Sequence, residues 1–311
     1  MDRLAEPGLT SAHNKAVAEF VCNICSGKNA YSGEPFERET PSCGSCGSTL
    51  RARALIGALS MELFGIQLTL ADFPRVKSWR GLGTSDSREY AKRLAEVFDY
   101  RNTFYDREPR FDLGKLDPGD PSQQPNQYDF LLSSEVIEHI APPINEAFRN
   151  AYSLLKPHGV LVFTVPYRLA TPTEHFPDLH EYGLAEVGNR IVLVNRTLAG
   201  EIQVREDLSF HRSGSEKALE MRVFSEEMLR NALAEAGFSS VKVHAGNYRP
   251  FGIVPVESWS LPITARKGPF ACNIDAMRDV MEEWRNLRKR LARSTWYRVG
   301  RRLGLLRGDA G

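Results

Sequence analysis

The sequence predicts an α/β fold built on an open, mostly parallel sheet with helices on both faces. The prediction rests on the stretch from Tyr128 to Tyr167, where a short apolar run, an amphipathic segment and a second apolar run follow one another. Brief apolar runs bounded by polar residues are typical of strands buried on both faces of a parallel sheet. Paired prolines before the amphipathic segment and Pro-His-Gly after it indicate where a helix begins and ends. Such a strand–helix–strand unit makes a right-handed crossover.

The same unit predicts where a ligand binds. The first apolar run stops at Ser133-Ser134-Glu135, and the second stops at Pro166-Tyr167. In open α/β sheets, ligands bind outside the carboxyl ends of the strands. We therefore expect Ser134 and Glu135 to border a ligand site.

These residues carry a resemblance to a known family. EVIEHI after the first strand, followed by LLKPHGVLVFTVP, resembles the motifs after strand four and at strand five of class I S-adenosylmethionine (SAM)-dependent methyltransferases. The resemblance covers residues 75–265. It implies a Rossmann-like, mostly parallel sheet of seven strands, and an enzyme that uses SAM as its cofactor. Its last two strands, at 240–244 and 259–265, would pair as an antiparallel hairpin.

The composition fits one large α/β domain with smaller additions. The chain has 311 residues, of which 42% are hydrophobic and 25% charged, and its formal net charge is +1. This balance gives no general argument for a nucleic-acid partner. The N-terminus lacks the apolar core of a signal peptide and no run approaches membrane-spanning length, so we expect a cytoplasmic protein.

We expect three parts in the chain. Residues 1–50 would form a zinc-ribbon-like knuckle, and residues 51–270 the methyltransferase domain, with an insertion or cap at 168–222. Residues 271–311 would form a basic amphipathic helical tail.

Four of the five cysteines form two CxxC pairs. Cys22 and Cys25 are separated from Cys43 and Cys46 by seventeen residues, and glycines follow both pairs. In a reducing compartment this pattern favours metal over disulfides. Four thiolates suit a tetrahedral, structural zinc ion without an open position. A redox dithiol is the alternative.

A helix is predicted from about Ser48 to Leu63, with Arg51 and Arg53 in its first turns. The two arginines could contact a phosphate or a substrate. We favour the other interpretation, a solvated helix face that packs the knuckle onto the main domain.

Gly81-Leu82-Gly83 is interpreted as a glycine-rich turn between a strand and a helix, and such a turn lets the backbone lie against a cofactor. The next residues, 84–86, would supply the N-cap of the helix. The resemblance makes this turn the family's first motif, with Gly81, Gly83 and Ser85 against SAM. The sequence departs from the family at Trp79-Arg80, where an acidic residue is usual, and a purely structural glycine turn is the alternative.

Two aspartates follow. Asp106 ends a short predicted strand, about twenty residues beyond the glycine turn, where nucleoside-binding α/β folds hold the ribose hydroxyls. The resemblance places Asp112 in the loop that contacts adenine. Either residue is otherwise an ordinary turn aspartate.

The insertion departs from the family's common core. Segments 190–194 and 202–204 predict a hairpin. Insertions at this point commonly cap the acceptor pocket in the family, so His175, His180 and His211 are candidates for a proton acceptor or a ligand. A hydrogen-bonded histidine without a catalytic role is the alternative. After the insertion, Ser225 is expected to cap a helix that ends near Gly237.

Glu135, Glu138 and His139 are spaced i, i+3 and i+4, so a helical turn would place them on one face. Similar EVIEH segments occur in ubiquinone-pathway O-methyltransferases and in small-RNA 2′-O-methyltransferases. In the latter, both acids and the histidine, with a further histidine, bind a divalent ion. By this resemblance His175 or His180 would be the further ligand. Otherwise His139 lies near the acceptor as a base or orienting group, or only anchors the helix.

The tail has apolar residues at three- and four-residue spacing from Met277 to Leu291, interleaved with basic residues. This pattern predicts a basic amphipathic helix, which could contact an anionic membrane or a protein partner. We favour the other interpretation, a helix packed on the body with a solvated basic face.

The sequence therefore predicts a SAM-dependent methyltransferase that methylates an oxygen or nitrogen of a small molecule or sugar. One alternative is an RNA-directed methyltransferase, in which the knuckle and tail dock the nucleic acid, although the near-neutral charge argues against it. The other is a non-catalytic binding module on the same fold.

Overall fold

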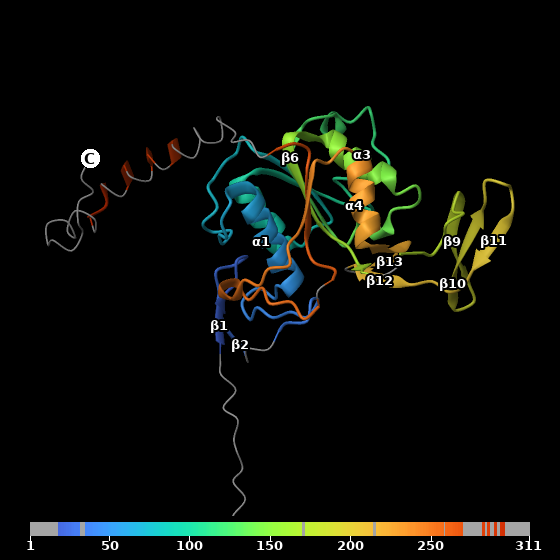
Figure 1. Ribbon diagram of the computed structural model, residues 1–311, viewed down its shortest axis with the longest axis horizontal. Helices are drawn as coiled ribbons and strands as arrows, with labels where there is room; N and C mark the ends of the chain where they lie inside the picture. Colours follow the sequence, from blue (N-terminus) through green and yellow to red (C-terminus); the bar gives the residue numbers. More distant parts are fainter. Residues whose placement is uncertain are drawn as a thin grey trace, which may run out of the picture.

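A six-stranded sheet lies at the centre of the molecule (Figure 1). The computed structural model describes residues 18–31, 35–169, 172–213, 216–257 and 259–269, and isolated positions between 282 and 295. The order of the strands is β15-β16-β6-β5-β3-β4. Their bounds are β3 (Arg80–Thr84), β4 (Asp99–Thr103), β5 (Tyr128–Ser134), β6 (Leu155–Thr164), β15 (Ser240–Val243) and β16 (Ile263–Arg266).

The four strands from β4 to β6 are parallel, and β16 and β15 continue the sheet in antiparallel pairs. This arrangement confirms the predicted α/β class and the antiparallel hairpin at the end of the domain. Within the hairpin only β15 is an edge strand, because β16 lies between β15 and β6.

Helices cover both faces of the sheet. Alternate residues of a strand point to opposite faces, and Phe130 and Leu132 accordingly pack in one hydrophobic cluster with α1 (Leu50–Phe64) and α2 (Arg88–Val97). Leu131 packs in the opposite cluster with α3 (Asn145–Leu154) and α4 (Glu226–Glu235). The Ser225 hydroxyl accepts a hydrogen bond from the Met228 amide, which confirms the predicted cap of α4.

The described sheet has six strands where seven were predicted. Between β4 and β5, residues 104–127 contribute only an isolated parallel bridge between Phe104 and Arg110. This interval is rich in proline, glycine and aspartate, which favour turns over extended pairing. It contains the short 3₁₀ helix η1 (Pro121–Gln123), and the Asp120 carboxylate caps η1 by accepting from the Ser122 amide. This interval therefore forms turns where the seventh strand was predicted.

The predicted glycine-rich turn is wrong in its placement. Gly81 and Gly83 lie inside β3 and are buried, and the turn comes later, at Ser85. The neighbouring strands explain the need for glycine here, because a Cβ at Gly81 would lie 2.7 Å from the Tyr100 ring and closer still to Phe130. Glycine at this position makes room for aromatic side chains of the adjacent strands.

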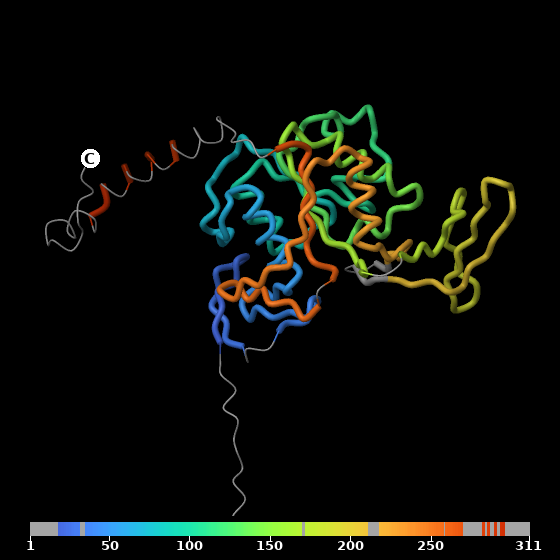
Figure 2. Tube along the Cα trace, viewed as in Figure 1, coloured from blue at the N-terminus to red at the C-terminus, as the bar shows by residue number. Residues whose placement is uncertain are grey.

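The N-terminal part forms a hairpin of β1 (Ala18–Val21) and β2 (Lys28–Tyr31) that carries the cysteine turns. It lies beside the segment 245–262, which includes the 3₁₀ helix η3 (Arg249–Phe251) (Figure 2). The Phe36 amide donates to the Val254 carbonyl at 3.1 Å. The knuckle is thus docked onto a loop from the far end of the chain.

Arg53 is fully buried, which corrects the predicted solvated face. Its guanidinium donates to the Ser48 carbonyl at 2.9 Å and to the Gly252 carbonyl at 3.1 Å. It also lies over the rings of Phe20 and Phe36, at 4.8 and 5.2 Å from their centroids. The aromatic faces and carbonyls compensate the charge that burial removes from water.

The insertion consists of short strands. They are β7 (Tyr167–Arg168), β8 (Thr173–Glu174), β9 (Glu181–Val187), β10 (Arg190–Arg196), β11 (Ile202–Arg205), β12 (Phe210–Ser213), β13 (Glu216–Leu219) and β14 (Arg222–Ser225). The predicted hairpin is confirmed, with Val194 opposite Val204. The strand β9 was not predicted; it pairs with β10 to make a three-stranded sheet that projects from the body (Figure 1).

Most of the predicted basic tail, including Met277 and Leu291, lies outside the described residues. Its helix therefore stays a prediction. In the described part of the chain, no helix combines the length and the apolar character that crossing a membrane requires.

The packing around Gly81 gives a test of stability. Gly81→Ala should lower the free energy of unfolding by about 1–3 kcal/mol, because the added methyl group overpacks the Phe130–Tyr100 contact. Gly183→Ala is the matched control, since that glycine also lies in a strand and a Cβ there meets nothing within 4 Å. Denaturant unfolding measures both variants. Equal stabilities would show that the strand accommodates the methyl group.

Candidate functional site

The carboxyl ends of β3, β5 and β6 meet at one edge of the sheet. Ser85 and Glu135, which follow β3 and β5, both have left-handed backbone conformations, with φ of 55° and 53°. Non-glycine residues adopt this conformation rarely, and it is common at functional turns. The Ser134 and Thr164 hydroxyls, at the ends of β5 and β6, are 3.2 Å apart. The predicted position of Ser134 and Glu135 at a strand-end edge is therefore observed.

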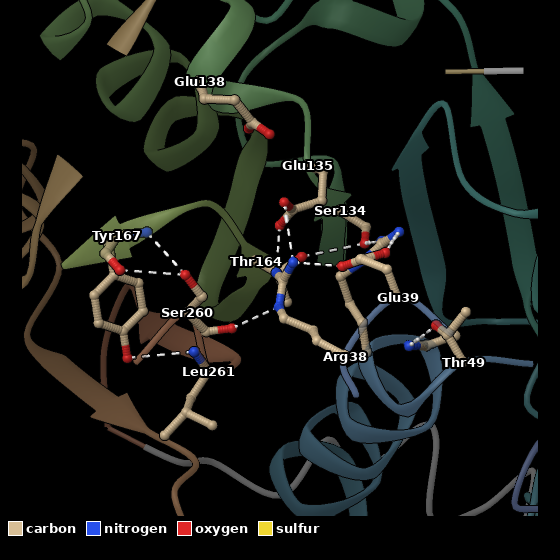
Figure 3. A network of polar contacts seen from close by, with 12 residues as sticks. Arg38, Glu39, Thr49, Ser134, Glu135, Glu138, Thr164, Tyr167, Ser260 and Leu261 are labelled. Carbon is tan, nitrogen blue, oxygen red and sulfur yellow. Dashed lines mark hydrogen bonds and ion pairs between the residues drawn. The ribbon is translucent and has the colours of Figure 1, made fainter. Parts of the chain in front are cut away.

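Arg38 reaches this edge from the segment between the two cysteine pairs (Figure 3). Its guanidinium forms a bidentate ion pair with Glu135, with nitrogen–oxygen distances of 2.5 and 3.2 Å. Its Nε donates to the Ser260 carbonyl at 3.0 Å. Burial raises the pKa of Glu135, but the charge of Arg38 outweighs this effect and the net pKa is lowered. Glu135 is therefore an ionised carboxylate held by a guanidinium.

Arg51 reaches the same edge from the first turn of α1. One of its terminal nitrogens donates to the Ser134 hydroxyl, and its remaining donors bind the Glu39 carboxylate at 2.8–3.0 Å. Glu39 also pairs with Arg38 at 2.5 Å. No sequence pattern pointed to Arg38, and for Arg51 we favoured a solvated face over a ligand contact. The only sequence signal for Arg51 was its position with Arg53 at the start of the predicted helix.

Glu138 and His139 lie in the 3₁₀ helix η2 (Ile137–His139). The Glu138 side chain is fully buried, and neither of its oxygens has a hydrogen-bond partner. Burial, and then the charge of Glu135, raise the pKa of Glu138 well above its usual value. His139 Nδ1 is 2.8 Å from the Leu219 carbonyl, which only accepts, so Nδ1 carries the hydrogen. The other nitrogen, Nε2, lies 3.7 Å from Glu138 Oε1.

The predicted helical face of Glu135, Glu138 and His139 is wrong. Glu135 lies before η2 in a left-handed conformation, so the three side chains do not follow one helical turn. Within the residues described, the four cysteines are the only cluster of potential ligands close enough to hold a metal ion. A divalent ion at Glu135, Glu138 and His139 has no assembled ligand set there.

The candidate histidines of the insertion differ in position. The His175 amide donates to the Met221 carbonyl, and the Met221 amide donates to the Glu138 carbonyl, both at 3.0 Å, so His175 is joined to η2 through Met221, which lies between β13 and β14. His175 Nε2 also pairs with Glu220 at 3.1 Å. His180 is exposed, and the side chain of His211 lies outside the described residues.

The predicted cofactor aspartates lie beyond β4. Asp106 is three residues past its end and is partly exposed beside Arg107. Asp112 accepts from the Gly114 amide at 2.8 Å, which is the bond of a turn aspartate. Asp86, expected near a helix N-cap, is instead fully buried under the Tyr90 and Tyr100 hydroxyls.

The N-cap of α2 is Ser87, the residue after Asp86, rather than one of the predicted residues 84–86. Burial raises the pKa of Asp86 to about 6.

The knuckle brings its four cysteine sulfurs within 4.8 Å of one another. Cys22 and Cys46 are 3.8 Å apart, and Cys25 and Cys43 are 3.6 Å apart. A tetrahedron with zinc–sulfur bonds of about 2.3 Å has edges of about 3.8 Å. Burial opposes ionisation of Cys43, but the Cys46 and Ser45 amides outweigh it and lower its pKa to about 6. Burial raises the pKa values of the Cys25 and Cys46 thiols, so the fit to a structural zinc ion rests on the geometry of the four sulfurs.

The edge also offers what SAM requires. A nucleoside with an amino-acid tail needs a carboxylate for the ribose hydroxyls, a cation for its own carboxylate and a turn that lets the backbone approach. Groups of these kinds lie near the strand ends: the carboxylate of Asp106 beyond β4, the guanidinium groups of Arg38 and Arg51, and the left-handed Ser85. These residues are of the types that would hold the cofactor, with the turn at Ser85 rather than at Gly83.

The comparison with protein families decides the class. Residues 61–243 match the family described as "Methyltransferase domain", which is more than half of the chain and includes β3 to β15. The chain belongs to this family. No curated protein matches it.

Many solved structures are similar to this methyltransferase-domain chain. One is a S-adenosylmethionine-dependent methyltransferase from Clostridium acetobutylicum, with 14% identity, TM-score 0.36 and coverage of 69% of this chain and 98% of that one. Another is the sugar N-methyltransferase KedS8 from Streptoalloteichus, with 14% identity, TM-score 0.40 and coverage of 72% and 90%. These values are too low to support an argument about the substrate.

Proposed function

We propose that the chain is a SAM-dependent methyltransferase that methylates an oxygen or nitrogen of a small molecule or sugar. The family match over residues 61–243 carries the proposal, because it includes the strand ends where Ser85, Asp106 and Glu135 lie. When bound there, SAM would supply an electrophilic methyl group. The chain's own residues would bind the cofactor, orient the acceptor and exclude water.

The acceptor of such a reaction must lose a proton when it is a hydroxyl or an amine. His139 is placed for this role, because its Nδ1 hydrogen is committed to Leu219 and its Nε2 is left as the basic nitrogen. Glu138, buried beside Nε2 and with a raised pKa, would share the proton rather than hold a fixed charge. His175 is joined to η2 only through Met221, and His180 is exposed, so His139 is the first candidate.

The knuckle would hold one zinc ion through Cys22, Cys25, Cys43 and Cys46. Its role would be structural, because four thiolates leave no open coordination position. It would fix the segment from which Arg38 reaches the sheet edge.

The proposal is tested by SAM binding and by labelled product. Calorimetry should show that the purified chain binds SAM. Incubation with methyl-labelled SAM and fractionated cell extract should place label in small molecules or glycan. Label in RNA would favour the RNA-directed enzyme instead. Absence of both binding and label would favour the non-catalytic module.

Substitution of His139 tests whether its side chain acts as a base or only anchors η2. His139→Ala should lower turnover by about a hundredfold or more while SAM affinity changes only a few-fold, the pattern of a lost acid–base group. His139→Asn keeps a donor for the Leu219 carbonyl but has no basic nitrogen, so it should be equally slow. Wild-type turnover in the Asn variant would make the residue an anchor only.

Metal analysis tests the knuckle. Purified protein should carry about one zinc ion per chain, and Cys43→Ser should bind it less tightly. Hydrogen exchange in that variant should rise most in residues 18–50, because the ion organises that segment. Zinc-free protein with four titratable thiols and unchanged exchange would contradict a structural ion.

A further inference from the structure

The edge of the sheet holds two guanidinium groups and two carboxylates, and the carboxylates differ. Glu135 is 18% exposed and is held at the end of β5 by Arg38. Glu39 is 54% exposed and lies on Arg51 through three contacts of 2.8–3.0 Å. One carboxylate is therefore part of the sheet edge, and the other comes from an exposed loop.

The side chain of Arg51 is held in place by its surroundings. It is only 22% exposed, it belongs to the first turn of α1, and one of its nitrogens donates to the Ser134 hydroxyl at the end of β5. Its remaining donors face Glu39. A guanidinium presents a rigid fork that matches a carboxylate in two parallel hydrogen bonds. The structure thus shows that a carboxylate is bound at this place, and the one that is bound belongs to a side chain open to solvent.

Arg38 and Arg51 also line one cleft, together with Thr164 at the end of β6 and Trp259. The cleft is small, with a volume of about 20 Å³, so a ligand would reach the guanidinium groups only after side chains move. If Glu39 swings out into solvent, Arg51 loses its counter-ion while Arg38 keeps Glu135. The site then has one unpaired positive charge, which an entering anion would neutralise.

We propose that Arg51, assisted by Arg38, forms a carboxylate-binding subsite that Glu39 occupies until a ligand carboxylate displaces it. The inference rests on the proposed function for its position beside the methyl donor. Two sources supply this chemistry, namely the amino-acid carboxylate of the methyl donor and a carboxylate on the acceptor. Glu39 acts as an internal competitor in either case.

Two nucleosides distinguish the sources. S-adenosylhomocysteine has the amino-acid carboxylate, and methylthioadenosine has the same nucleoside and sulfur without it. For the donor source, Arg51→Met should weaken binding of S-adenosylhomocysteine by about tenfold or more, the loss expected for a charge-assisted bidentate pair. Binding of methylthioadenosine should stay within about twofold, because that ligand never meets the guanidinium. Arg51→Lys keeps the positive charge without the planar fork, so its affinity for S-adenosylhomocysteine should lie between those of the wild type and Arg51→Met.

The Glu39 variant is expected to change affinity in the opposite direction. Glu39→Gln removes the competing carboxylate, so S-adenosylhomocysteine should bind about two- to fivefold more tightly, as an exposed ion pair is weak. The affinity for methylthioadenosine should not change. Arg149→Met is the matched control, because Arg149 pairs with Glu146 on α3. Thermal unfolding of each variant shows whether it is folded.

The outcomes are distinct. If nucleoside binding is unchanged but Arg51→Met, at saturating SAM, loses label only in products retained by an anion exchanger, the carboxylate belongs to the acceptor. Equal weakening of both nucleosides by Arg51→Met in folded protein would overturn the subsite, and so would unchanged binding with unchanged label. Wild-type protein that binds neither nucleoside would overturn the proposed function, and the inference with it.

Discussion

The buried guanidinium of Arg53 holds the N-terminal part of the molecule together. It joins the knuckle through the Ser48 carbonyl, the aromatic rings of Phe20 and Phe36, and the late loop through the Gly252 carbonyl. Burial lowers its pKa, and the nearby Cys22, Cys43 and Cys46 thiolates oppose that effect. Four thiolates around a divalent ion carry net negative charge, so the proposed zinc site and the buried cation would compensate each other. The positions of Arg38 and Arg51 depend on this junction.

The sequence was sufficient for those parts of the fold whose signals are local. The apolar runs of β5 and β6 and the capped helix α4 follow from periodicity and from single capping residues, and the structure has them. Gly81 shows where this reasoning fails. A glycine in a strand and a glycine in a turn look alike in sequence, and only the aromatic rings of neighbouring strands decide between them.

The candidate site likewise has one part that the sequence predicts and another that it does not. The cysteine spacing alone predicts the cluster that the structure brings together. Arg38 meets Glu135 across 97 residues of sequence, and a contact at that separation leaves no periodic pattern to find. Asp86 was misjudged for a related reason. It has the sequence position of a cap, but its carboxylate instead accepts buried hydrogen bonds from the hydroxyls of Tyr90 in α2 and Tyr100 in β4.

The contact between Arg53 and Gly252 spans 199 residues and has a consequence for synthesis of the chain. A ribosome releases the cysteine turns long before it makes the loop that they dock against. The proposed zinc site would be complete early, but the Gly252 carbonyl that Arg53 binds does not yet exist. Contacts at such separation are slow to form, because a long intervening chain must first be ordered. Docking of the knuckle is therefore a late event, and until then Phe20 and Phe36 lack the surface that covers them.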